Sequence, residues 1–153
     1  MTNRFVHLHL HTEYSLLDGG NTVKRLVEHV KQLGMTSVAV TAPANLHAAM
    51  EFYAHARAEG IKPILGIEAY VAPECRTRRQ KETTGPNSGF HLVLLAENEA
   101  GWRNLLKLSS DAYLSGFYHR PRMDKATLAQ WSEGVIAING HLGSSLAWHL
   151  VKF

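Results

Sequence analysis

The sequence predicts an α/β fold in which helices cover a parallel sheet. The predicted strands are enough for only part of a barrel. Almost continuously apolar segments alternate with segments of helical period, which is typical of buried parallel strands. Chemistry-bearing residues follow several predicted strands, as in barrels whose sites are built from strand–helix loops, and the chain has no glycine-rich phosphate loop. A full eight-stranded barrel needs about 250 residues. This chain has 153 residues and about five predicted strands.

The N-terminal segment predicts a strand, a loop and a helix. Residues 5–10 alternate in polarity and predict the first strand, and residues 12–20 predict a loop. The helix is expected over residues 22–33, with Asn21 as its N-cap and Gly34 as its stop. Its apolar residues recur at helical spacing: Val23, Leu26, Val27, Val30 and Leu33.

The next segment predicts a second strand, a second helix and a third strand. Residues 36–41 predict the second strand. Asn45 is the expected cap of a helix that carries Leu46, Ala49, Met50 and Tyr53 on one side and ends at Gly60. Residues 62–71 predict the third strand.

The second half of the chain continues the alternation. Its predicted elements are a strand at 90–96, a helix at 99–114, a short helix at 124–131, a strand at 135–138 and the start of a helix at 143–152.

Composition narrows the class of protein. The net charge of +3 is compatible with a phosphate-bearing partner and does not establish one. Ten histidines in a short chain favour metal or proton chemistry. The single Cys75 excludes an internal disulfide and fits a reducing compartment. The chain has neither a signal pattern nor an apolar run of membrane-spanning length, so we expect a soluble, cytoplasmic protein without a membrane partner.

Alternation places His7, His9 and His11 on one face of the first predicted strand. A strand face lined with imidazoles suits a divalent metal, since imidazole nitrogen is a common ligand. A half-exposed strand whose histidines face water explains the same spacing, so both interpretations stay open at this point.

Two basic segments are candidates for phosphate or nucleic-acid contact. Residues 74–89 predict either a mobile, solvated loop or a basic flap over a phosphate site. The run Phe117–Arg122 predicts either a surface turn or a nucleic-acid contact through arginine stacking. The candidate residues are Arg76, Arg78, Arg79, Arg120 and Arg122.

Several blocks resemble one family. The opening FVHLHLHTEYSLLDG is similar to the start of the PHP (polymerase and histidinol phosphatase) domain, and more narrowly to that of bacterial DNA polymerase III alpha subunits, the family C replicative polymerases. Later blocks resemble the same family in the same order: GIKPILGIEAYVAP, NLLKL, YLSGFY, RPR and SEG. The resemblance covers essentially all of residues 1–153, which we interpret as the N-terminal portion of a longer PHP domain.

The resemblance implies a distorted seven-stranded βα barrel, here truncated to about five strands, with a trinuclear metal site at the C-terminal ends of its strands. The implied ligands are His9, His11, Asp18, Glu68, His91 and His141, and Glu68 corresponds to a glutamate that typically bridges two metals. Such donors imply zinc or manganese, with iron or magnesium as alternatives, and one or two ions.

Two departures from the family pattern weaken the implied site. The family motif Thr-Asp-His-Gly-Asn is replaced by Thr41-Ala42-Pro43-Ala44-Asn45, so Pro43 stands where a ligand histidine is expected. The final Asp-x-His pair of the family lies beyond residue 153. By analogy, Glu68, His91 and His141 complete one metal site. His9, His11 and Glu68 supply part of the ligands of a second metal site, and Asp18 is the one ligand left for the third.

The resemblance implies metal-assisted phosphoester hydrolysis of the 3′–5′ exonuclease or pyrophosphatase type, weakened by residues 42–44. One alternative is a non-catalytic platform that binds a proofreading exonuclease, and another is a standalone PHP phosphatase. The implied partners are DNA, the remainder of the alpha subunit (a DNA-directed DNA polymerase), a proofreading exonuclease and a second copy bound through open barrel edges.

Overall fold

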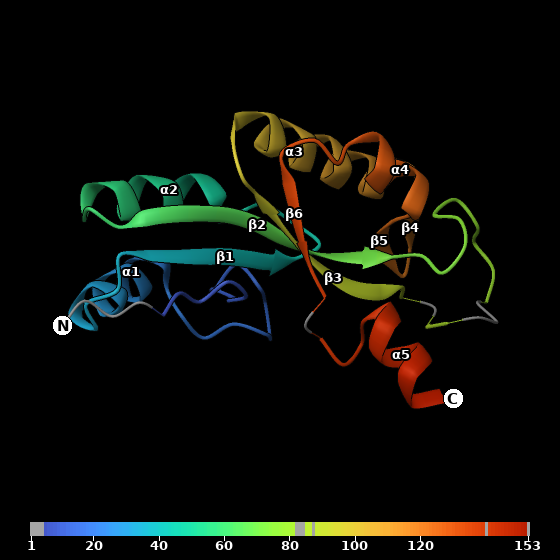
Figure 1. Cartoon of the computed structure of the whole chain (residues 1–153), viewed down its shortest axis with the longest axis horizontal. Coiled ribbons are helices and arrows are strands. Elements are labelled where there is room, and N and C mark those ends of the chain that lie inside the picture. The colour runs from blue at the N-terminus through green and yellow to red at the C-terminus, as the bar shows by residue number, and fades with distance from the viewer. Residues whose placement is uncertain (1–4, 82–84, 87, 140, 153) are drawn as a thin grey trace.

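The computed structural model describes residues 5–81, 85–86, 88–139 and 141–152 (Figure 1). In chain order its elements are α1 (Val23–Gln32), β1 (Ser37–Pro43), α2 (Ala49–Ala58), β2 (Lys62–Val71), β3 (Phe90–Ala96), α3 (Glu99–Leu114), β4 (Phe117–Tyr118), β5 (Arg120–Met123), α4 (Lys125–Gln130), β6 (Val135–Ile138) and α5 (Ser145–Lys152). The predicted α/β class is confirmed. None of the helices within these described residues is long and apolar enough to cross a bilayer.

The described strands form one six-stranded sheet around β2. Along one edge, β2 pairs in parallel first with β1 and then, at Tyr70 and Val71, with β5. On its other edge β2 pairs with β3, which is antiparallel both to β2 and to β6. The prediction of a wholly parallel sheet is therefore wrong at β3, because apolar patterning shows that a strand is buried but not in which direction it runs.

The prediction of a strand over residues 5–10 is also wrong, although this segment lies next to β1. Residues 5–10 run beside β1 without forming a ladder. The Ala39 N–H donates to the His7 carbonyl at 2.8 Å, and the Thr41 N–H donates to the Leu10 carbonyl at 2.9 Å. These two bonds place His9 and His11 against the end of β1.

Helix starts differ from the prediction at two caps. Thr22, rather than Asn21, caps α1 by accepting a bond from the Arg25 N–H. Asn45 does not cap α2, because its side chain closes a local turn by accepting the His47 N–H at 3.1 Å, and the helix begins at Ala49. Short polar side chains often make such local turns in place of caps.

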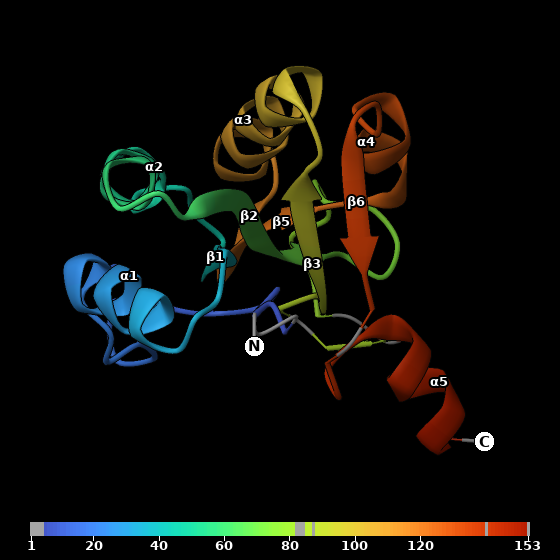
Figure 2. The ribbon, with the colours of Figure 1, turned by 60° about the vertical axis from the view of Figure 1, so that its left-hand side comes forward.

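Four helices cover one face of the sheet. Figure 2 shows α1, α2, α3 and α4 around the outside of the curved sheet, with the N-terminal stretch on the other side. One apolar cluster joins α1 and α2 to β1, and a second joins α3 to β2 and β3. We call this the outer face. The opposite, inner face carries a smaller cluster of Ala39, Val93 and Leu95.

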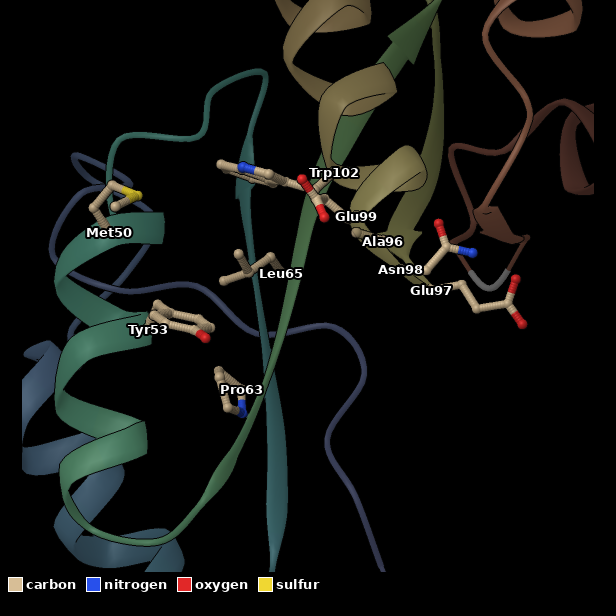
Figure 3. A pocket seen from close by; sticks show the side chains of 9 residues that line it. All are labelled: Met50, Tyr53, Pro63, Leu65, Ala96, Glu97, Asn98, Glu99 and Trp102. Atoms are coloured by element: carbon tan, nitrogen blue, oxygen red, sulfur yellow. The ribbon is translucent and has the colours of Figure 1, made fainter.

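Strand alternation assigns the residues of β2 to these faces. Ile67 and Ala69 pack in the outer cluster, so Gly66, Glu68 and Tyr70 belong to the inner face. Gly66 is needed because an added Cβ would lie 2.6 Å from the Leu94 carbonyl oxygen. A groove of about 420 Å³ lies between α2 and α3 on the outer face, lined by Met50, Tyr53, Pro63, Leu65, Ala96, Glu97, Asn98, Glu99 and Trp102 (Figure 3). It is therefore separate from the inner-face residues.

Candidate metal centre

Glu68 is the centre of a histidine cluster on the inner face. Its side chain is only 3% exposed. One carboxylate oxygen, Oε2, accepts from His9 Nε2 at 2.7 Å and from His11 Nε2 at 2.8 Å. The other, Oε1, accepts from His91 Nδ1. The two oxygens of one carboxylate therefore face two different groups of imidazoles.

His141 joins the cluster through His91. The two imidazole rings stack with centroids 4.3 Å apart and an angle of 10° between their planes. The described residues thus contain two groups of potential ligands that share Glu68: His9 and His11 form one, and His91 and His141 form the other. Within each group the ligand atoms lie within 4.8 Å of one another.

Gly143 fixes the second group through its backbone. Its carbonyl accepts from the His91 N–H at 3.0 Å, and its N–H donates to His141 Nδ1 at 2.8 Å. A Cβ at this position would lie 2.9 Å from His141 Nδ1 and 3.0 Å from His91 Cδ2. An alanine at this position would require one or both imidazole rings to shift. Sequence analysis missed Gly143, because its role depends on backbone bonds that only the folded chain forms.

The cluster holds Glu68 as an anion. Burial alone raises the pKa of this carboxyl group, but hydrogen bonds from His91, His9 and His11 outweigh burial and lower the pKa to about 2. At neutral pH, Glu68 is therefore a carboxylate with both oxygens directed at imidazole nitrogens, which is the charge state that metal binding requires.

Asp18 lies beside the cluster rather than in either ligand group. Its Oδ2 atom is 3.2 Å from His11 Nδ1, and its side chain is 67% exposed. A carboxylate on the second nitrogen of a histidine fixes that ring's orientation and tautomer. An open hollow of about 310 Å³ adjoins these residues and is lined by His9, Leu10, His11, Asp18, Gly19, Gly20 and Asn21.

Pro43 also belongs to the inner face. The β1–β2 register pairs Pro43 with Glu68, so position 43 is the nearest place on β1 from which a side chain could join the cluster. Proline offers neither a ligand atom nor an N–H donor there. The next residue, Ala44, has a φ of 59°, a left-handed conformation that favours glycine.

The basic candidates separate into structural and exposed residues. The predicted nucleic-acid contact is wrong for Arg122, whose side chain is fully buried and donates to the carbonyls of Arg76 and Arg78 at 3.1 and 2.5 Å. Arg76 is occupied by carboxylates, with Nη1 3.1 Å from Asp124 Oδ2 and Nε 2.5 Å from an Asp111 oxygen.

The remaining basic candidates are closer to solvent. Arg78 pairs with Glu74, and Arg79 and Arg120 are exposed. Residues 82–84 and 87 of the predicted mobile loop lie outside the described residues. The mobility of segment 74–89 stays a prediction.

The donor set suits a divalent cation. Imidazole and carboxylate together are typical ligands of zinc, manganese and iron. A carboxylate with one oxygen directed toward each of two histidine pairs has the arrangement of a bridging ligand. The residues present therefore fit one or two ions, and they would hold them through Glu68.

Comparisons with known proteins agree with these features. Residues 7–152 match the PHP domain family. The chain is 46% identical over 141 residues to the DNA polymerase III subunit alpha of Borreliella burgdorferi, covering 92% of this chain and 12% of that protein. It is 49% identical over 146 residues to the same subunit of Helicobacter pylori (strain ATCC 700392 / 26695), covering 95% of this chain and 12% of that protein.

A solved structure, an amidohydrolase from Chromobacterium violaceum, aligns with a TM-score of 0.48 and 20% identity, covering 69% of this chain and 34% of that one. The chain thus spans about an eighth of the length of the curated relatives it matches. Since the family match extends over nearly all of its residues, the chain belongs to the PHP domain family.

Proposed function

We propose that this chain serves as the PHP domain of a DNA polymerase III alpha subunit and binds one or two divalent ions for phosphoester hydrolysis. The observation that carries the proposal is the buried Glu68 carboxylate, which directs Oε2 at His9 and His11 and Oε1 at His91. The similarity of the chain to DNA polymerase III alpha subunits supports its assignment to such a subunit.

Each residue of the cluster has a defined task. Glu68 would hold one or two ions, with His9 and His11 as further ligands on one side and His91 and His141 on the other. Asp18 orients His11 through its Nδ1 atom. Ions bound there supply charge neutralisation for phosphoryl oxygens and activation of a water molecule. With several imidazoles in the set, zinc or manganese fits better than magnesium, which prefers oxygen ligands, and iron remains an alternative.

Hydrolysis is expected to be weak in this chain. Pro43 removes a ligand beside Glu68, and Asp18 alone represents the third site. The proposed substrates are the 3′ end of DNA, in proofreading, or pyrophosphate. The proposed partners are DNA and the remainder of the alpha subunit, in the cytoplasm.

The second candidate function is a non-catalytic platform for a separate proofreading exonuclease. The observation that favours it is the Ala42-Pro43-Ala44 segment, because it removes a ligand position next to Glu68 without disturbing the β1–β2 pairing. A standalone phosphatase is disfavoured by the 46% and 49% identities to polymerase subunits. Assembly of two copies would use β6, which among the described strands pairs only with β3.

Elemental analysis of the chain purified without added metal tests the proposal. We expect at least one equivalent of zinc, manganese or iron per chain, and loss of it in Glu68→Gln, which weakens both ligand groups. His47→Gln, an exposed histidine outside the cluster, is the matched control and should retain the metal. A content well below one equivalent in the unaltered protein would contradict metal binding. Metal without turnover of bis(p-nitrophenyl) phosphate or pyrophosphate would favour the platform.

A further inference from the structure

The hairpin of β4 and β5 brings two arginines to the inner face of the sheet. The β2–β5 register pairs Tyr70 with Arg122. Because side chains alternate along a strand, Arg120 lies on the same face as Arg122, Tyr70 and Glu68. The sequence Arg-Pro-Arg therefore directs two guanidinium groups toward the side of the sheet that carries the histidine cluster.

Arg122 is buried and anchors the β4–β5 hairpin. Its buried guanidinium binds carbonyl oxygens of residues 76 and 78, and it lies 5.0 Å from the centre of the Tyr118 ring. These contacts tie the hairpin to the segment that follows β2. The backbone of Arg120, two residues earlier, is held by the same hairpin.

The Arg120 side chain contacts an aromatic ring but has no hydrogen-bond or ion-pair partner among the described residues. Its guanidinium carbon lies 5.5 Å from the centre of the Tyr70 ring, and the side chain is exposed. Arg76, by contrast, is neutralised by Asp111 and Asp124. A cation–π contact fixes an arginine by its face and leaves its N–H donors free in the plane.

Tyr70 connects Arg120 to the cluster. Its ring lies 4.9 Å from the His91 ring, measured between centroids. The Tyr70 ring therefore contacts both the Arg120 guanidinium and the His91 imidazole.

We infer that Arg120, held over Tyr70, is a phosphate-binding subsite of the metal centre. Its free N–H donors take non-bridging oxygens of a phosphate-bearing substrate while the phosphoryl group to be hydrolysed lies at the Glu68 cluster. Guanidinium groups bind phosphate through paired, charge-assisted hydrogen bonds, which a carboxylate and imidazole cluster lacking bound cations does not provide. The inference rests on the proposed function and adds its substrate-binding residue.

Isothermal titration of the manganese-loaded full chain with pyrophosphate tests the subsite. We expect Arg120→Ala to weaken binding about tenfold, with bound metal unchanged by elemental analysis. Arg103→Ala is the matched control, because Arg103 is 70% exposed on α3 and pairs only with Glu99 among the described residues.

A parallel arm separates two sources of the phosphate. A fluorescent single-stranded oligonucleotide with a phosphorothioate 3′ end resists hydrolysis and reports binding by anisotropy. If Arg120→Ala loses affinity for the oligonucleotide alone, the subsite binds a nucleic-acid end. If it loses affinity for pyrophosphate alone, the subsite binds a small anion. Equal affinities of the Arg120→Ala and unaltered proteins for both probes would overturn the subsite.

The outcome is distinct from a failure of the proposed function. If the chain retains no metal, metal binding is refuted, and the same titrations are made on metal-free protein. A tenfold loss in Arg120→Ala there would still support the subsite. If Arg120→Ala loses metal together with phosphate affinity, Arg120 is a structural residue and the inference is wrong.

Discussion

Pro43 and Glu68 are direct neighbours across the parallel β1–β2 ladder, on the face where the Glu68 carboxylate meets the histidines. Both oxygens of the Glu68 carboxylate are bonded to imidazole nitrogens, whereas Pro43 on the adjacent strand offers no ligand atom. This pairing leaves one position beside the histidine cluster without a potential ligand.

Restoring a donor beside Glu68 should therefore increase metal binding. Pro43→His is expected to raise the metal content by up to about one equivalent, because imidazole is a competent ligand at a position that faces the cluster. Ala42 pairs with Ile67 and faces the outer core, so it stays unchanged in this variant. Phosphoesterase activity should rise with it when an Asp-x-His pair of the family type is also supplied. Pro63→His is the control, since Pro63 lies on the outer face. Equal metal content in the Pro43 variant and the unaltered chain would show that Pro43 is not the defect.

The metal-free protein should lose stability in acid through Glu68. The folded-state pKa of about 2 lies below the unfolded value of about 4.3, so the unfolded chain binds the proton first as pH falls. The contribution of this group to the free energy of unfolding is fully present above about pH 5, and about 3 kcal/mol of it is lost as the pH falls below about 2. Urea unfolding at a series of pH values measures it. Glu68→Gln should flatten this dependence, while the exposed Glu99→Gln should not.

A methyl group at position 143 should disturb one ligand group and spare the other. In Gly143→Ala the added Cβ would press on both His91 and His141. We expect loss of the ion shared by Glu68, His91 and His141, measured as metal equivalents, with the His9 and His11 side retained. Leu142→Ala, at an exposed neighbour, is the control. An unaltered metal content in Gly143→Ala would show that the loop yields and that the glycine has no positioning role.

Much of the fold could be predicted because helical spacing and apolar runs are local signals. The bounds of β2, β3 and α3 agree with the predicted ranges 62–71, 90–96 and 99–114. Strand direction depends on which edges meet in space, so the antiparallel β3 was not foreseen. The β4–β5 hairpin was missed because its strands are short and its residues basic, and the buried state of Arg122 depends on carbonyls over 40 residues away.

The candidate site was predicted unevenly. Family resemblance named His9, His11, Glu68, His91 and His141, and the structure brings these five side chains together. Whether they bind metal stays a prediction. Periodicity alone would have left His91 as an ordinary strand residue. The contributions of Gly143 and Tyr70 could not be inferred, because they arise from backbone bonds and ring contacts that only the folded chain creates.

The carboxylate of Asp124 should be important for stability, although it is remote from the metal cluster. It caps α4 by accepting the Thr127 N–H at 2.9 Å, and it binds both the backbone and the guanidinium of Arg76. Burial raises the pKa of Asp124, but bonds from Thr127 and Arg76 outweigh burial and lower it.

Asp124→Ala removes the cap and leaves Arg76 with one carboxylate, so a loss of about 3 kcal/mol in the free energy of unfolding is expected. Urea denaturation measures this loss. Asp111→Asn removes the other, more exposed partner of Arg76 and should cost less. Because Arg76 also supplies a carbonyl to Arg122, Asp124→Ala should loosen the hairpin that carries Arg120. Faster hydrogen exchange at residues 117–123 would reveal that loosening, and unaltered exchange there would show that Arg122 holds the hairpin without help from Asp124.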